Sequence, residues 1–291
     1  MTVPLLHWFY PTSPATALPP TPREKYSVLI PVSLPSTGGP LVQLADAIIG
    51  PQRDSSRLHA LHLRDPVDHE AYRSGLDETE QPEDQTLTPL LAQARARALS
   101  VEPISFVSRD ISGDICSVAD AKHVNLVLMG FHRPVFGKSM LGGIVHRVLT
   151  SCGSHVAILV DRGFRGLQRI LVPYLGSAHD LLAMELAYRC ARNLASEVTV
   201  LHVVPPVRGQ ASRTLGARSA VDRIFADPSL ARPVRFEVVE DASPVGAVLQ
   251  QAGEYDLVII GVAEEWGLES HLFGWRAERL ARDCPVSLLI V

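Results

Sequence analysis

A segment in the first half of the chain combines glycines with basic side chains, just before a helical pattern that starts near Ile144. Glycines allow backbone amides to approach a phosphate closely, and the first turn of the following helix adds partial positive charge. Basic side chains in the same segment add further attraction. The segment therefore predicts a site for a phosphate or another anion. Its candidate residues are Gly130, His132, Arg133, Gly137, Lys138, Gly142, Gly143 and Ile144.

Other chemical motifs are incomplete or absent. Residues 132–139, HRPVFGKS, resemble a Walker A loop whose first glycine is replaced by histidine. His59 and His62 lie three residues apart on a predicted strand and so point to opposite faces, which argues against a shared metal. Asp110 precedes a helical pattern, so N-capping explains it better than pairing with Asp114. Without a GxSxG, HExxH or CxxC motif, the sequence favours a binding module over an enzyme and predicts no metal site.

Length and composition limit the class of protein. The 291 residues suffice for two domains, and the 46% of hydrophobic and 20% of charged residues are typical of a globular chain. A net charge of −4 gives no electrostatic support for nucleic-acid binding. The cysteines lack CxxC spacing, which argues against a disulfide framework or zinc ribbon and fits a reducing cytosol. They are Cys116, Cys152, Cys190 and Cys284.

Residues 1–24 differ from the rest of the chain. No apolar run reaches the roughly 20 residues that a membrane-spanning helix needs. The opening MTVPLLHWFY ends in adjacent aromatic residues, as membrane interfaces favour, and the alternative is a loosely packed tail. Five prolines in residues 11–22 predict an extended linker. Folded structure is expected to begin near Lys25.

Short apolar runs alternate with helical patterns along the rest of the chain, and the whole pattern occurs twice. The segment at 169–173, RILVP, mirrors SVLIP at 27–31, and DLVIIG at 256–261 mirrors NLVLMG at 125–130. Such alternation specifies a parallel sheet with helices on both faces. We expect one domain at 25–163 and another at 168–291. Strands are expected at 27–32, 57–63, 102–107, 125–131, 155–161, 169–173, 197–203, 234–239, 256–261 and 286–291, and helices at 41–49, 87–99, 111–122, 142–151, 178–194, 212–225, 244–252 and 274–282.

Ligands of open parallel sheets bind beyond the carboxyl ends of the strands, where the strand order reverses. The loops after the first and fourth strands of each copy are therefore the places to look for a site. In the first copy this adds Pro31, Val32 and Ser33 to the glycine-bearing segment as candidate residues.

These residues resemble the universal stress protein family. The family's first strand ends in Pro-Val-Asp, its fourth strand ends in glycine, and a loop of the form Gly-x2-Gly-x9-Gly-Ser/Thr opens the next helix. The resemblance covers about residues 25–291 and implies an α/β fold of two tandem, doubly wound, five-stranded parallel sheets. The matching positions are Pro31, Val32, Gly130, Gly142 and 144–149 in the first copy, and Pro173, Gly261, Gly274, 277–282 and 284–291 in the second.

The resemblance implies ATP or another adenine nucleotide as the ligand. In ATP-binding members the glycine loop holds the phosphates, and the Asp after the first strand lies at the nucleoside end. The first copy departs from that pattern, with Ser33 in place of the Asp, Arg133 in place of the second glycine, and Gly143 in place of the Ser or Thr.

The second copy departs further, and we expect it to be structural. Leu175 replaces the Asp and Trp275 replaces the Ser or Thr. Glu264 and Glu265 stand where a phosphate would lie, and like charges repel. Ser177 is expected to cap the helix that follows it.

The chain also resembles the cytoplasmic tail of bacterial cation/proton antiporters of the sodium/hydrogen exchanger type. This implies a regulatory module at the inner face of the plasma membrane, joined to a membrane antiporter domain that carries out the transport. The alternatives are a free-standing tandem stress protein that binds ATP, a structural dimerisation module and a weak ATP hydrolase. Because the last strand of each copy is an apolar sheet edge, we expect these two edges to face each other within the chain, with a homodimer as a further alternative.

Overall fold

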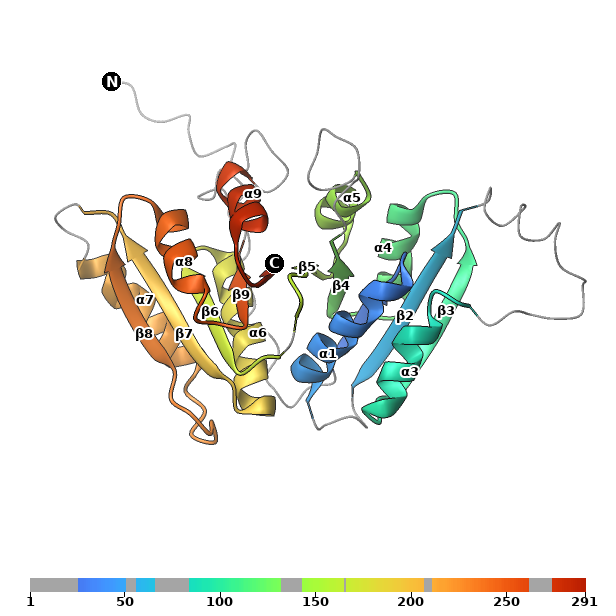
Figure 1. Ribbon diagram of the computed structural model, residues 1–291, viewed down its shortest axis with the longest axis horizontal. Coiled ribbons are helices and arrows are strands. Elements are labelled where there is room, and N and C mark those ends of the chain that lie inside the picture. The colour runs from blue at the N-terminus through green and yellow to red at the C-terminus, as the bar shows by residue number, and fades with distance from the viewer. Residues whose placement is uncertain are drawn as a thin grey trace, which may run out of the picture.

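The computed structural model describes residues 26–50, 56–65, 84–131, 143–164, 166–206, 211–261 and 274–291. Two α/β copies follow one another along the chain, as Figure 1 shows. The first contains β1 (Ser27–Pro31), η1 (Pro35–Thr37), α1 (Gly38–Ile49), β2 (Arg57–Arg64), α3 (Thr88–Ala96), β3 (Val101–Val107), α4 (Ile111–Ala121), β4 (Leu126–Gly130), α5 (Gly143–Ser151) and β5 (His155–Val160). The second contains β6 (Arg169–Tyr174), α6 (Ala178–Leu194), β7 (Glu197–Val204), α7 (Ala211–Ile224), β8 (Arg235–Glu240), α8 (Pro244–Ala252), β9 (Leu257–Ile260), α9 (Gly274–Asp283) and β10 (Ser287–Ile290).

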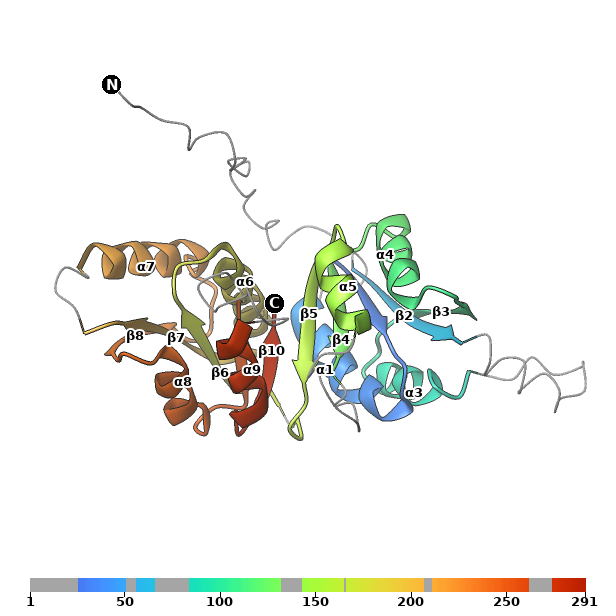
Figure 2. The ribbon, with the colours of Figure 1, turned by 90° about the horizontal axis from the view of Figure 1, so that it is seen from above.

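The strands form one sheet in the order β3-β2-β1-β4-β5-β10-β9-β6-β7-β8. Pairing is parallel within each copy, which confirms the predicted pair of five-stranded parallel sheets. At the centre β5 and β10 pair antiparallel, with Leu289 opposite Leu159, so the two predicted sheet edges do meet. Figure 2 shows this seam from above, and the pairing makes the two sheets continuous.

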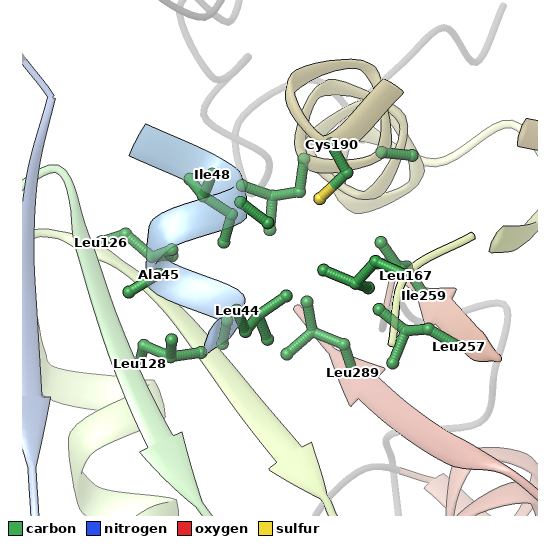
Figure 3. Packing of buried hydrophobic residues seen from close by; sticks show 14 of the residues in the cluster. Leu44, Ala45, Ile48, Leu126, Leu128, Leu167, Cys190, Leu257, Ile259 and Leu289 are labelled. Atoms are coloured by element: carbon green, nitrogen blue, oxygen red, sulfur yellow. The ribbon is translucent and has the colours of Figure 1, made fainter. Parts of the chain in front are cut away.

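Helices cover both faces of the sheet, because its strands are apolar on both sides. The buried side chains of α1, α3, α6 and α7 pack with one face. Those of α4, α5, α8 and α9 pack with the other. Figure 3 shows that the first of these cores is shared, since Leu44 of α1 and Leu128 of β4 lie near Leu289 of β10 and Ile259 of β9. The two copies therefore bury apolar surface against each other as well as within themselves.

Polar contacts reinforce this junction. The Asn193 side chain donates to the carbonyls of Ala47 and Ile48 and so satisfies the end of α1 from the second copy. In the other direction, the Arg162 guanidinium donates to two carbonyls at the end of α9, those of Ala281 and Arg282. Each copy thus completes a helix terminus of the other.

A buried ion pair of the second copy also contacts the first copy. Arg189 and Glu185 of α6 lie 2.9 Å apart with side chains only 5% and 9% exposed. The Arg189 guanidinium lies 4.0 Å from the ring centroid of Tyr26, the residue that precedes β1. Burial raises the pKa of the Tyr26 hydroxyl to about 12. The start of the first copy is therefore held by a charged pair of the second.

The cysteines correct one expectation. Cys116 of α4 and Cys152, which follows α5, form a disulfide with Cα atoms 4.9 Å apart, so the sequence argument against disulfides is wrong for this pair. The absence of CxxC spacing gave no sign of the pair, because its members are 36 residues apart and are brought together by the packing of α4 on α5. Cys190 and Cys284 are free and buried.

Among the described residues, no helix combines the length and the hydropathy that crossing a membrane requires. The tail and linker at 1–24 lie outside the described residues.

Candidate functional site

The topological switch point of the first copy lies between β1 and β4, where the order of the strands reverses. Direct pairing of these strands ends at Leu29 opposite Val127, although β1 continues to Pro31 and β4 to Gly130. The carboxyl ends of the two strands are thus not paired with each other. This is where open parallel sheets bind ligands.

The first wall of this position is the segment after β1. The Val32 amide donates to the carbonyl of Leu61 at 2.8 Å, which continues the strand by one residue, and the Val32 side chain is buried. Ser33 and Leu34 are exposed, with Leu34 48% accessible. Pro31 and Val32 therefore form the floor of the loop, whereas Ser33 presents a neutral hydroxyl group to its surroundings.

The second wall is the end of β4. A Cβ atom placed on Gly130 would lie 3.5 Å from Cβ of Thr37 and 3.6 Å from Cδ1 of Leu41. Gly130 thus faces the start of α1 at ordinary contact distance. Beyond it the Phe131 amide donates to the carbonyl of Leu159 and keeps the chain on the sheet.

The third element is the start of α5. Gly143 is exposed, no atom of the described residues lies within 4 Å of a Cβ atom placed on it, and Ile144 is 42% exposed. Of the predicted residues, the structure places Pro31, Val32, Ser33, Gly130, Gly143 and Ile144 on elements that flank the switch point. The predicted residues His132, Arg133, Gly137, Lys138 and Gly142 lie outside the described residues.

The second copy has the same switch point, but its own side chain fills the loop after the strand. Pairing of β6 with β9 ends at Leu171 opposite Val258. One carboxylate oxygen of Asp180 accepts hydrogen bonds from the amides of Leu175, Gly176 and Ser177 at 3.0, 2.9 and 2.9 Å. These are the kind of clustered backbone donors that bind an anion, and here the anion is built in.

Asp180 also closes the N-terminus of α6. Its own amide donates to Ser177 Oγ, so Ser177 is the N-cap as predicted and the two residues form a capping box. Burial raises the pKa of the Asp180 carboxyl, and the three amides only partly offset this effect. The spacing Ser-x-x-Asp in the sequence is a capping-box signal, but the spacing does not indicate that the same carboxylate also accepts from the loop amides.

Close packing at Gly261 completes the difference between the copies. A Cβ atom placed there would lie 2.3 Å from the backbone of His179 and Asp180. The start of α6 therefore rests directly on the end of β9, and the second switch point is closed by backbone. Leu175 follows β6 as expected, while Glu264 and Glu265 lie outside the described residues and nothing is described of the Trp275 side chain.

The two strand histidines have separate carboxylate partners. His62 Nδ1 lies 2.7 Å from Asp84 Oδ2, and Ser105 donates to the same oxygen at 2.6 Å. His59 Nδ1 lies 3.0 Å from a carboxylate oxygen of Glu102. The described residues include no cluster of three or more side chains suited to a metal.

Asp84, which precedes α3, is held by polar partners and is only partly exposed. Burial acts to raise the pKa of its carboxyl, but hydrogen bonds from Ser105, His62 and the Leu87 amide outweigh it and hold that pKa below its usual range. Asp84 thus anchors the segment before α3 to β2 and β3. Asp110, by contrast, is an N-cap as predicted, because its side chain accepts from the Gly113 amide.

Comparisons with known proteins agree with this architecture. The chain is 25% identical to Cation/H(+) antiporter 19 of Arabidopsis thaliana, in an alignment that covers 66% of this chain and 28% of that protein. Cation/H(+) antiporter 17 of the same plant is 27% identical, in an alignment that covers 57% of this chain and 24% of that protein. The chain thus spans about a quarter of the length of these curated relatives.

Solved structures show the same fold. A universal stress protein from Archaeoglobus fulgidus superposes with a TM-score of 0.60 at 19% identity, covering 91% of this chain and 97% of that one. A functionally unknown protein from Pseudomonas aeruginosa gives 0.59 at 19% identity, with 92% of each chain covered. The model of the universal stress protein family matches residues 27–159 and again residues 166–291. The chain therefore belongs to the universal stress protein family, and it carries two such regions in tandem.

Proposed function

We propose that the chain is a non-enzymatic regulatory module that binds an adenine nucleotide in its first copy only and acts on a cation/proton antiporter. Binding would shift the relative arrangement of the two copies, and the transport chemistry would lie in a membrane domain. The site would comprise Pro31, Val32 and Ser33, the end of β4 and the start of α5. The basic side chains of 132–138 would bind the phosphates.

The observation that carries the proposal is the difference between the two switch points. In the second copy the Asp180 carboxylate accepts hydrogen bonds from three loop amides, and Gly261 packs directly against the backbone of α6. Counted from the corresponding strands β1 and β6, the counterpart of Asp180 in the first copy is Gly38, which has no carboxylate. The first copy therefore lacks this built-in anion, and a ligand phosphate would take its place.

The antiporter part of the proposal is supported by the curated relatives, which are named cation/H(+) antiporters and are several times longer than this chain. We propose a location at the inner face of the plasma membrane and domain boundaries at 25–163 and 168–291. The competing functions are a free-standing ATP-binding stress protein, a weak ATP hydrolase, and a structural module that dimerises without a ligand.

The test is equilibrium titration of the full chain with labelled ATP. We expect one site per chain, tighter binding in Ser33→Asp, and weaker binding in Lys138→Ala. Ser219→Asp is the charge-matched control, because Ser219 is exposed on α7 in the other copy. Two sites per chain would contradict the asymmetry. No binding, together with no thermal stabilisation by ATP or AMP, would favour the structural module instead, whereas phosphate release above buffer would favour the hydrolase.

A further inference from the structure

The disulfide in the first copy holds α5, the third element of the candidate site, at the end of the helix away from that site. Cys116 is in the middle of α4, and Cys152 follows the last residue of α5. The covalent ring from 116 to 152 includes β4, the glycine-bearing crossover and the whole of α5. The bond therefore fixes α5, whose N-terminus would meet the phosphates.

Little else among the described contacts holds α5 as firmly. Val148 is its one fully buried residue, while Gly143, Ile144, His146 and Arg147 are exposed. Arg147 forms an ion pair with Asp110 at 3.2 Å, but both side chains are more than half exposed, and such pairs add little. Val145 and Leu149 are partly buried against the same core as Val148, and the cysteine pair adds a covalent attachment of α5 to α4.

The equivalent helix of the second copy is held without a crosslink. Counted from Gly130 and Gly261, the counterpart of Cys116 is Ala247. Counted from the equivalent buried helix residues Val148 and Leu280, the counterpart of Cys152 is Cys284, so the second copy lacks one cysteine of the pair. Instead, α9 buries Leu280 and Ala281, and Arg162 binds its last carbonyls. A disulfide is therefore present only in the copy whose site lacks a built-in anion.

The two sulfur atoms differ in accessibility. Cys116 is buried at 9% exposure, whereas Cys152 is half-buried. An external thiolate would attack Cys152 Sγ, form a mixed disulfide with it and release the Cys116 thiolate. A second external thiol then attacks the mixed disulfide, so that two thiols are oxidised to their disulfide while both cysteines gain a proton.

We propose that Cys116 and Cys152 are a reversible dithiol–disulfide pair that responds to a low-molecular-weight thiol couple and fixes α5 when oxidised. In a reducing compartment a disulfide is generally transient and regulatory, which fits the proposed location. The effect on nucleotide affinity rests on the proposed function: oxidation preorganises the helix N-terminus and tightens binding, and reduction weakens it.

The first experiment needs no nucleotide. The full chain is equilibrated with glutathione at stepped ratios of thiol to disulfide, and its free thiols are then alkylated and located by mass spectrometry. We expect Cys116 and Cys152 to gain label together, while Cys190 and Cys284 stay unlabelled in the folded chain. Both are buried, and burial raises the pKa of the Cys190 thiol to about 12 and that of Cys284 above its ordinary value.

Amide hydrogen exchange of the same samples reports on the helix. We expect residues of α5 to exchange about tenfold faster after reduction, with α9 unchanged as the internal reference. The variant Cys116→Ser with Cys152→Ser should behave like the reduced chain, and Cys284→Ala like the oxidised chain. Equal exchange of α5 in both states, or a pair that cannot be interconverted by glutathione, would overturn the proposal.

A titration with labelled ATP in each redox state separates the two proposals. At least a fivefold weaker affinity after reduction is expected, within the range of ordinary coupling between sites. Redox-dependent exchange without nucleotide binding in either state would remove the proposed function but keep the switch. Equal affinities in both states would remove the regulatory role of the switch and keep the nucleotide site.

Discussion

Single residues explain why two copies of one architecture differ at the same place. Gly130 and Gly261 end equivalent strands, yet a side chain on Gly130 would make ordinary contacts, whereas one on Gly261 would overlap the backbone of α6. The difference arises from the position of the helix start relative to the strand. It decides whether the carboxyl end of the sheet is closed by the chain itself.

This difference predicts unequal effects of the same substitution. Gly261→Ala should destabilise the chain by about 1–3 kcal/mol, because the added methyl group forces the start of α6 away from β9. Gly130→Ala is the matched control and should cost less than about 1 kcal/mol, since its nearest neighbour would be 3.5 Å away. Urea unfolding of both variants measures the free energies, and equal losses would contradict the described packing.

Asp180 gives a second prediction at this scale. Asp180→Ala should cost about 1–3 kcal/mol, because the loop amides lose their acceptor inside the fold. Asp180→Asn should be milder, since it retains an oxygen and removes a buried charge whose pKa is raised by burial.

The sign of the pH effect follows from that raised pKa. The pKa of Asp180 is higher in the folded chain than in the unfolded chain, so the folded chain binds this proton more tightly. The stabilisation that results is complete at pH values below the pKa of Asp180 in the unfolded chain, and it is lost as the pH rises through the pKa in the folded chain. Asp180→Asn should remove this contribution. Unfolding measured from pH 4 to pH 8 checks it, and an unchanged slope would show that Asp180 does not titrate as described.

Whole elements were largely predictable from the sequence, and the site was not. The apolar runs gave strands within one or two residues of β1, β4, β6 and β9, because a strand buried on both faces leaves a clear composition. Asp110 and Ser177 were recognisable caps, because capping depends on neighbours in the sequence. Local signals of this kind carry over directly to structure.

Contacts between distant elements left no such signal. The pairing of Cys116 with Cys152 depends on how α4 packs on α5, and the partners of Asp84 come from β2 and β3. The filling of loop amides by Asp180 depends on the direction of a single side chain at the start of α6. Spacing alone does not specify any of these arrangements.

The anchoring of α3 gives a prediction at the scale of the element. Asp84→Ala removes the acceptor of Ser105 and of the Thr86 amide and the partner of His62, and should cost about 1–2 kcal/mol at neutral pH. Hydrogen bonds hold the pKa of the Asp84 carboxyl in the folded chain below its ordinary value. The contribution of Asp84 to stability is therefore complete at pH values above its pKa in the unfolded chain, and it is lost as the pH falls through its pKa in the folded chain.

Thermal unfolding at several pH values tests the Asp84 prediction. The difference between Asp84→Ala and the unmodified chain should shrink as the solution becomes acidic. Asp222→Ala is a suitable control, because among the described residues Asp222 forms an exposed pair with Arg218 on α7. A difference that is constant with pH would contradict the role given to Asp84.

At the scale of the whole molecule, the two copies pack against each other through several kinds of contact. A shared apolar core, the β5–β10 seam and the Tyr26–Arg189–Glu185 contact all cross the boundary between them. We therefore expect a ligand or a substitution in one copy to affect the stability of the other.

The buried ion pair provides the test. Arg189→Met leaves the Glu185 carboxylate buried without its partner and should cost about 3–5 kcal/mol. Adding Glu185→Gln should restore much of that loss, because the unpaired charge is removed. A double-mutant cycle by denaturant unfolding measures the coupling, and additive effects of the two substitutions would show that the pair does not act as a unit.

The antiparallel seam has a consequence for how such a module works when it is attached to something larger. Two stress-protein units that meet as separate chains depend on their concentration to stay together, whereas here the partner is supplied by the same polypeptide at a high local concentration. The assembled state therefore persists at any abundance of the protein, and each chain delivers one complete, asymmetric pair.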